Sequence, residues 1–393
     1  MIDRIRAQAA ADFPDLLRVR HHLHTHPELS FQEHATAAFI AEELRAMGIE
    51  VRTRVAGTGV IGLLKGNGEG RTIALRADMD ALPITEANGC DYRSVNAGVM
   101  HACGHDAHMT CVLGAARILH ALRAEWRGTV MLVFQPGEEK IPGGASLLVK
   151  ENALRDPAPS GILGQHCTPE LEVGRIGFRE GPFMASSDEL YITVKGKGGH
   201  AALPERLIDP IVISAHLLLR LKAEFAAYRP EEKLVLAFGK VIANGATNVV
   251  PDEVHIAGTL RAFNEPLREE LHAWLPKRAH EICAEYGGSC DFEVRKGYPV
   301  LVNDPALTRR MRAAAEAYMG KENVITMDQR MGSEDFAFYT HVMPGCFYRL
   351  GTGSPGAPFR GLHTPTFDID EQALGIGAGL MAFGAIAELA QHA

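Results

Sequence analysis

The chain has 393 residues, 46% of them hydrophobic and 22% charged, a composition typical of a folded protein with ample apolar material to bury. This length exceeds what one compact core normally serves, so we expect two domains. Forty Lys and Arg residues against 48 Asp and Glu give a net charge of −8 without a basic block, which argues against nucleic acid or a membrane surface as the main partner.

The N-terminal segment carries acidic residues and lacks an apolar run of signal-peptide length, and no later segment offers about 18 uninterrupted apolar residues. We therefore expect a cytoplasmic protein without a membrane span. Seven cysteines, an odd number spread thinly along the chain, do not have the pattern of a disulfide framework. Eighteen histidines raise the question of a metal site.

The N-terminal part alternates between helical and strand patterns. A helix is expected at 14–24, where the histidines between 21 and 26 would cap the helix or face solvent, and a second helix should run from the capping-box pair Ser30 and Glu33 to Gly48. Strand patterns follow at 51–55, 60–65 and 72–76, then a helix at 106–124 and a strand at 129–134. Short apolar runs recur at 161–163, 324–327 and 346–350. This alternation predicts an α/β sheet with helices on both faces.

The middle of the chain has a different order of elements. Strand, helix, strand, strand, helix and strand are expected at 189–195, 209–227, 234–241, 254–263, 265–286 and 290–295. This βαββαβ order is the ferredoxin-like pattern, which forms a closed unit. We therefore expect a discontinuous catalytic domain of residues 1–185 and 300–393, with residues 186–299 inserted as a second domain.

Side chains that suit metal chemistry follow the predicted strands of the larger domain. They are Asp78 and Asp80 after 72–76, Glu138 and Glu139 after 129–134, His166 and Cys167 after 161–163, His363 after 346–350, and Cys103 and His105 just before the helix at 106. Ligands of α/β sheets gather beyond the carboxyl ends of strands, so these side chains are expected on one rim.

A divalent cation explains this mixture of carboxylates, imidazoles and a thiol. The single residue between Cys103 and His105 lets both side chains reach one site from a tight turn. A thiolate with imidazoles favours zinc or a similar metal such as manganese, cobalt or nickel. Of the adjacent acids Glu138 and Glu139, one can ligate metal while its neighbour takes a proton from metal-activated water. Asp80 is better suited to orienting His105 or a metal than to binding directly.

Nine segments in chain order carry a family resemblance. They are HTHPELSFQE (24–33), LRADMDALPI (75–84), MHACGHDAHM (100–109), FQPGEE (134–139), GKGGHAALPE (196–205), NVVPDEV (248–254), GTLRAF (258–263), GSEDFAFY (332–339) and LHTPTFDID (362–370). Together they closely resemble the metal-dependent amidohydrolases that include hippurate hydrolases, N-acyl-amino-acid hydrolases and plant auxin-conjugate hydrolases. The resemblance implies a mixed-sheet, zinc-peptidase-like α/β catalytic domain with an inserted α+β ferredoxin-like lid, which is also a dimerisation domain.

The same resemblance implies the roles of individual residues. It implies two divalent metal ions held by Cys103, His105, Glu139, His166 and His363, with Glu138 as general acid/base. In the lid it implies substrate contacts from His200, Asn248 and Arg261. Arg261 would pair with a substrate carboxylate, and His200 would support the oxyanion from the partner subunit of a homodimer.

The leading hypothesis is metal-dependent hydrolysis of the amide bond of N-acyl-L-amino acids or small peptides. An alternative is a cysteine hydrolase that uses Cys103 with His101 or His105. In that case the metal-free protein would be active, and a thiol alkylator would inactivate it stoichiometrically. A non-catalytic, metal-dependent binding protein is a third reading. The presence of Glu138, which such a protein could lose freely, argues against it.

Overall fold

The computed structural model describes residues 1–392 and divides into two compact units. The larger unit comprises Met1–Gly181, Val302–Asp328 and the chain from Asp335 onward, and the inserted unit comprises Pro182–Leu301 and Gln329–Glu334. The segment Gln329–Glu334 thus groups with the inserted unit, although the sequence placed it with the catalytic domain. The chain passes between the units within β7 (Gly181–Met184) and β14 (Leu301–Asn303), and again at each end of Gln329–Glu334.

A mixed sheet of eight strands forms the centre of the larger unit. In spatial order these are β1 (Glu50–Val55), β2 (Gly59–Lys65), β4 (Thr129–Gln135), β3 (Thr72–Asp78), β5 (Ile162–Glu172), β16 (Gly345–Gly353), β6 (Ile176–Phe178) and β15 (Val324–Thr326). The central strands β4, β3, β5 and β16 are parallel to one another. Every residue of β3 is buried, as expected for a strand covered on both faces.

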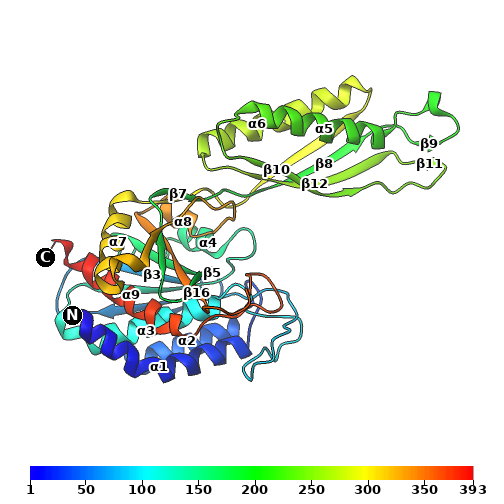
Figure 1. The fold of residues 1–393 in the computed structure, drawn as a ribbon. Helices are drawn as coiled ribbons and strands as arrows, with labels where there is room; N and C mark the ends of the chain where they lie inside the picture. Colours follow the sequence, from blue (N-terminus) through cyan, green and yellow to red (C-terminus); the bar gives the residue numbers. More distant parts are fainter. Residues whose placement is uncertain (393) are drawn as a thin grey trace. The chain divides into compact units, whose positions relative to one another are not determined.

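Helices cover both faces of this sheet (Figure 1). They are α1 (Ile2–Thr25), α2 (His34–Ala46), α3 (His105–Ala121), α4 (Gly144–Lys150), α7 (Pro305–Met319), α8 (Ala337–Thr340) and α9 (Gln372–Leu389), with 3-10 turns η1 (Arg123–Glu125), η3 (Lys321–Asn323) and η4 (Ala390–His392). Helices α1, α3 and α9 pack against one another on one face. The predicted α/β sheet is therefore confirmed.

Two helices differ from the sequence prediction. Helix α1 begins at Ile2, so Pro14 lies inside it instead of starting it. Helix α9 has no counterpart in the prediction, because it is apolar nearly all round and shows no helical period. By length and composition α9 could cross a membrane, but 67% of the segment is buried inside the folded chain, as in the core helix of a globular unit.

The predicted capping box at α2 is wrong. Glu33 precedes the helix without a side-chain capping bond. Its carboxylate accepts hydrogen bonds from Thr58 Oγ1 (2.6 Å), from the backbone N–H of Gly137 (2.8 Å) and from that of Phe31 (2.9 Å). Ser30 Oγ donates to Asp80 Oδ2 at 2.6 Å. Both side chains therefore form tertiary hydrogen bonds, and neither caps the start of α2.

The inserted unit has the predicted ferredoxin-like order. It contains β8 (Asp188–Lys195), α5 (Pro210–Tyr228), β10 (Val235–Ile242), β12 (Glu253–Arg261), α6 (Glu265–Glu285) and β13 (Ser289–Lys296), with short β9 (Gly199–His200), η2 (Pro204–Arg206) and β11 (Val249–Val250). The sheet order is β10-β12-β8-β13, and all neighbours are antiparallel. Its own apolar core, with Leu190 and Ile192 of β8 against α5 and α6, makes it a compact unit.

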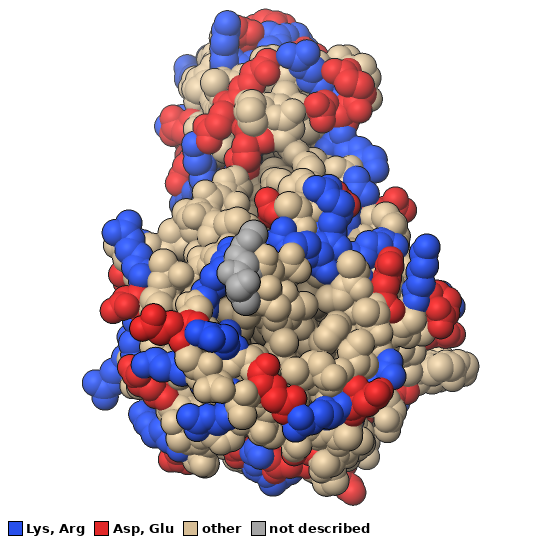
Figure 2. Space-filling model, turned by 90° about the vertical axis from the view of Figure 1, so that its left-hand side faces the viewer, with Lys and Arg blue, Asp and Glu red and all other residues tan. Residues whose placement is uncertain are grey.

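The charged side chains form no single large block on the face shown in Figure 2. Lys and Arg occur there together with Asp and Glu, separated by wide uncharged areas. This distribution matches the modest net charge of −8.

Candidate metal centre

The candidate ligands come from the strand ends and the adjacent helix start of the larger unit. Asp78 is the last residue of β3, and Glu138 and Glu139 follow β4. His105 is the first residue of α3. His166 lies within β5, which runs from Ile162 to Glu172, so it does not follow the strand as predicted. The difference is one of strand length only, and the side chain still reaches the rim.

Gly104 makes the turn that brings Cys103 and His105 together. It has φ +85°, in the left-handed region that favours glycine, and an added Cβ would lie 2.9 Å from Cys167 Sγ. A larger residue would force the Cys167 side chain to shift. The single small residue between the thiol and the imidazole therefore has a steric as well as a spacing role.

The five predicted ligands assemble in two groups that share Cys103. One potential ligand atom each from Cys103, His105 and His166 lies within 4.8 Å of the others, and the same holds for Cys103, Glu139 and His363. Within these groups Cys103 Sγ is 3.4 Å from His166 Nε2, and Glu139 Oε1 is 3.1 Å from His363 Nε2. Two overlapping donor sets with a common thiol suit a pair of neighbouring cations.

Glu138 lies beside these groups. It forms a further set of neighbouring donors with His105 and Glu139, and its side chain is buried. The structure thus brings the predicted base and the predicted ligands to one site.

Asp80 holds the two adjacent glutamates in place. Its Oδ1 accepts from the backbone N–H of Glu138 and its Oδ2 from that of Glu139, both at 2.9 Å. Ser30 adds its hydroxyl to Oδ2, and His105 Nδ1 is 3.4 Å from Oδ1. These donors use the carboxylate of Asp80 and connect it to Glu138, Glu139 and His105.

His108 has both ring nitrogens engaged by the protein. Its Nδ1 is 2.6 Å from Asp78 Oδ1, and its Nε2 accepts from the backbone N–H of Cys167 at 2.8 Å. Arg76 Nη1 donates to the other oxygen of Asp78 at 2.7 Å. With no free lone pair on its ring, His108 acts as a packing and orienting residue.

The electrostatics of the site favour a cation. Burial lowers the pKa of His105, but the charges of Asp78, Asp80 and Glu139 outweigh this effect and raise it to about 10. Burial and the charges of Glu139 and Glu138 raise the pKa of the Cys103 thiol well above its usual range. Burial, followed by the charge of Arg349, lowers the pKa of His166, so its imidazole is neutral, as a metal ligand must be.

The residues present fit a divalent ion. His105 Nε2 is buried and has no hydrogen-bond partner among the residues that the structure describes, while its Nδ1 is 2.8 Å from Asp80 O. An imidazole fixed through one nitrogen with the other unpartnered is the usual state of a ligating histidine. A bound cation would also reverse the pKa shift of Cys103 by stabilising the thiolate.

The histidine cluster at 21–26 differs from its predicted solvent-facing role. His24 is fully buried, with Nδ1 2.8 Å from Asp106 Oδ2 and Nε2 3.1 Å from Glu86 Oε1. The other three lie nearer the surface, where His21 stacks on Tyr92. His24 was missed because its partners lie 62 and 82 residues away in sequence.

The three predicted substrate residues lie in the inserted unit, where they fall into two separate places. His200 on β9 pairs with Val249 on β11, next to Asn248, and both side chains are exposed. Arg261 ends β12, whereas β11 adjoins its first residue, Glu253. A nine-residue strand spans roughly 27 Å, so within this unit Arg261 and His200 do not face one small molecule.

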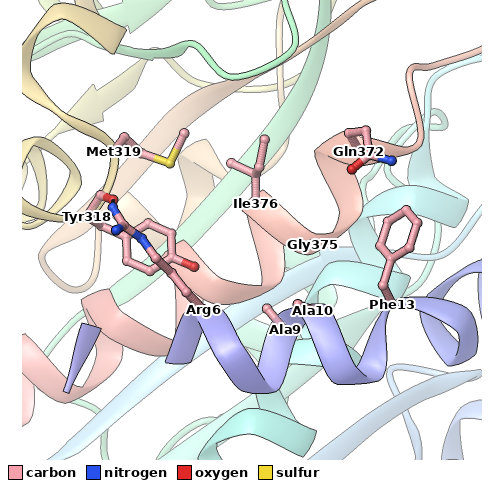
Figure 3. A pocket seen from close by; sticks show the side chains of 9 residues that line it. All are labelled: Arg6, Ala9, Ala10, Phe13, Tyr318, Met319, Gln372, Gly375 and Ile376. Atoms are coloured by element: carbon pink, nitrogen blue, oxygen red, sulfur yellow. Dashed lines mark hydrogen bonds between the residues drawn. The ribbon is translucent and has the colours of Figure 1, made fainter. Parts of the chain in front are cut away.

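A groove of about 450 Å³ elsewhere on the larger unit lies between α1, α7 and α9. Figure 3 shows its lining residues, which are Arg6, Ala9, Ala10, Phe13, Tyr318, Met319, Gln372, Gly375 and Ile376. None of these described residues offers a carboxylate, imidazole or thiol. The groove is therefore no candidate for the metal chemistry.

Comparisons with known proteins identify the family of this chain. Residues 74–383 match the profile of peptidase family M20/M25/M40. An N-acyl-L-amino acid amidohydrolase of Geobacillus stearothermophilus is 42% identical over 290 residues, covering 74% of this chain and 78% of that protein. The IAA-amino acid hydrolase ILR1-like 4 of Arabidopsis thaliana is 38% identical over 381 residues, covering 94% and 85%.

A solved structure extends the similarity to the whole fold. The YXEP protein of Bacillus subtilis, described as a dinuclear metal binding peptidase from the M20 family, is 36% identical with a TM-score of 0.84. The match covers 97% of this chain and 99% of that one. The chain therefore belongs to peptidase family M20/M25/M40 and is a metal-dependent hydrolase of that family, an amidohydrolase or peptidase.

Proposed function

We propose that the chain hydrolyses the amide bond of N-acyl-L-amino acids or small peptides, with two divalent cations of Zn, Mn, Co or Ni. Cys103, His105, Glu139, His166 and His363 would hold the cations. The observation that carries the proposal is the meeting of these five side chains in two donor groups that share Cys103, with Glu138 beside them.

When bound, divalent cations polarise a carbonyl oxygen and lower the pKa of water. Glu138 acts as the general base that takes the proton of the attacking water and then delivers it to the leaving amide nitrogen. Its backbone bond to Asp80 fixes its place, and the adjacent bond fixes Glu139. This division of labour between neighbouring acids needs no covalent intermediate.

Arg261 is suited to binding the carboxylate of an N-acyl amino acid. It is half-buried, and burial lowers its pKa. Its Nη1 donates to Ser333 Oγ at 3.1 Å, but among the described residues it forms no ion pair with a carboxylate. A half-buried guanidinium with spare donors favours a bidentate anionic ligand. The name of the Geobacillus relative supports the same substrate class.

His200 would serve the site of a second copy in a homodimer formed through the inserted unit. Its separation from Arg261 along β12 supports this arrangement. Exposed apolar residues on this unit also support the proposal, since β10 is an edge strand with exposed Val241 and Ile242, and α5 exposes Leu219. Edge strands with exposed apolar residues are ready templates for pairing with another chain.

The cysteine-hydrolase alternative has little support in the geometry. Cys103 is 6% exposed and its thiol pKa is raised, whereas a nucleophilic cysteine needs an accessible thiolate. His101 is a poor base, because burial lowers its pKa to about 4.

The test is a substrate and metal screen. Protein stripped with a chelator is reloaded with Zn, Mn, Co or Ni and assayed on N-acetyl, N-benzoyl and indoleacetyl amino acids, with their C-terminal amides as controls. We expect activity only after reloading and preferentially on the free carboxylates. Full activity of the stripped protein, or abolition by a thiol alkylator in the absence of metal, would reject the proposal.

A further inference from the structure

His363 is the candidate ligand with the least regular structure around it. It lies in the segment 354–371, which joins β16 to α9 without a helix or strand. Its φ is 59°, a left-handed conformation that side chains other than glycine seldom adopt, and its side chain is 53% exposed. A ligand on such a loop keeps its position only if other residues hold the loop.

Backbone bonds hold the first part of this loop. The N–H of His363 donates to Ala102 O, and the N–H of Ala87 donates to Pro365 O, both at 2.8 Å. Phe367 is fully buried, next to Gly104. These contacts place the loop near the Cys103 turn. In its second part the backbone N–H of Asp370 donates to Thr352 O at 2.8 Å, and side chains supply the connection to α3.

Arg20 of α1 connects that second part to α3. Its guanidinium is fully buried and donates to Asp368 Oδ1 at 2.6 Å and to Glu371 Oε1 at 2.8 Å. The third nitrogen, Nε, donates to Asp106 Oδ2 at 3.2 Å. Asp106 stands in the first turn of α3, directly after His105. One planar cation thus ties the loop of one candidate ligand to the helix of another.

The charges make this connection specific to arginine. Asp106 also contacts His24, and Asp368 also accepts hydrogen bonds from Arg360 and Tyr92, so both carboxylates keep partners without Arg20. What would be lost is the set of charge-assisted bonds by which one guanidinium joins the two segments. Lysine would restore one positive charge but could not repeat three directed bonds from a rigid plane. The position therefore calls for the geometry of the guanidinium as well as its charge.

We propose that Arg20 is a positioning residue of the metal centre, which holds segment 354–371 against α3 and so fixes His363 beside Glu139 and Cys103. This inference rests on the proposed function, because it takes His363 as a metal ligand. Arg20 contacts none of the candidate ligands and acts through Asp368, Glu371 and Asp106.

The test is a pair of variants, Arg20→Met and Asp368→Asn, each made in the natural sequence and in a His363→Ala background. Co²⁺ affinity is measured by titration against a competing chelator, together with the thermal midpoint. We expect each variant to lower Co²⁺ affinity roughly 10- to 100-fold in the natural sequence. With His363 absent there is no ligand to position, so the same change should alter the affinity by less than about twofold.

A merely structural role gives a different result. It would lower the Co²⁺ affinity by the same factor in both backgrounds, and that outcome overturns the inference. Arg310→Met is the matched control, because Arg310 forms a similar fork with Glu388, at 2.8 and 2.9 Å, between α7 and α9. It should reduce the thermal midpoint and leave Co²⁺ affinity unchanged.

The outcomes also separate this inference from the proposed function. If Arg20→Met does not fold, Asp368→Asn carries the test, because it keeps the side-chain shape and removes only the charge. Unchanged Co²⁺ affinity of His363→Ala would remove His363 from the ligand set and the inference with it. Weaker binding by His363→Ala with unchanged binding by Arg20→Met and Asp368→Asn would reject the role of Arg20 alone.

Discussion

Replacing Glu138 by glutamine should separate metal binding from catalysis. The two side chains have the same shape, and the backbone bond from residue 138 to Asp80 at 2.9 Å does not depend on the side chain. The amide cannot accept the proton of the attacking water, so turnover should fall roughly 100- to 10,000-fold. This range corresponds to about 2.7–5.4 kcal/mol of transition-state stabilisation. The KM and the metal content should stay nearly unchanged.

The assay is the initial rate on an N-acyl amino acid at saturating substrate, with the metal content measured by elemental analysis of the same preparation. Glu42→Gln on the exposed face of α2 is the matched control and should leave both quantities unchanged. The reciprocal variant Glu139→Gln should contain less bound metal than Glu138→Gln, because residue 139 is the candidate ligand. Turnover of Glu138→Gln within about threefold of the natural protein would refute Glu138 as the base, since general-base catalysis contributes far more. Loss of metal from Glu138→Gln but not from Glu139→Gln would exchange the roles of the two acids.

Three further predictions follow from individual contacts. Cys103→Ser should lower the bound metal found by elemental analysis, because both donor groups lose their shared thiol; full occupancy would remove Cys103 from the ligands. Arg261→Ala should raise KM for carboxylate-bearing substrates far more than for their amides, and equal effects would contradict carboxylate binding. Burial lowers the pKa of His24, but the charge and hydrogen bond of Asp106 and the hydrogen bond of Glu86 raise it to about 9. Its stabilising contribution, on the order of 3 kcal/mol, is therefore complete below pH 6.5 and is lost as the pH rises through about 9. Urea unfolding of the natural protein should show this fall in the free energy of unfolding with pH, and His24→Gln should not; the same fall in both proteins would reject the role of His24.

A rim of metal-suited side chains could be predicted from the sequence because their positions follow a local pattern, and the resemblance to a known family implied which of them are ligands. Apolar runs in the sequence predict where each strand ends. Ligands of α/β sheets gather at the carboxyl ends of the strands. Glu139 follows the end of β4 in this way. Cys103 and His105 flank Gly104, and a glycine at this place indicates a tight turn. The βαββαβ order of the inserted unit was equally readable, because each element has its own period and turn signals.

Other parts of the fold carry no local signal. Helix α9 is surrounded by α1, α3 and α7, so it needs no polar face and shows no period of 3.6 residues. Small residues permit this close packing, and they add no polar face that would mark the helix in the sequence. Gly379 shows the reason, since an added Cβ would lie 2.0 Å from Tyr318 Oη.

The residues that hold the ligands in place are the hardest to predict, and the reason is physical. A ligand must be one of a few side-chain types, whereas any donor or acceptor in the right place can orient it. Ser30 and Glu33 had the spacing of a capping box, worth about 1 kcal/mol at an exposed helix end. In the fold they meet buried groups, Asp80 and Gly137, which cost more than that if left without partners. The cost of leaving these buried groups without partners exceeds the capping energy, so it determines which hydrogen bonds form. That cost arises only when segments 50 and 104 residues apart in sequence come together.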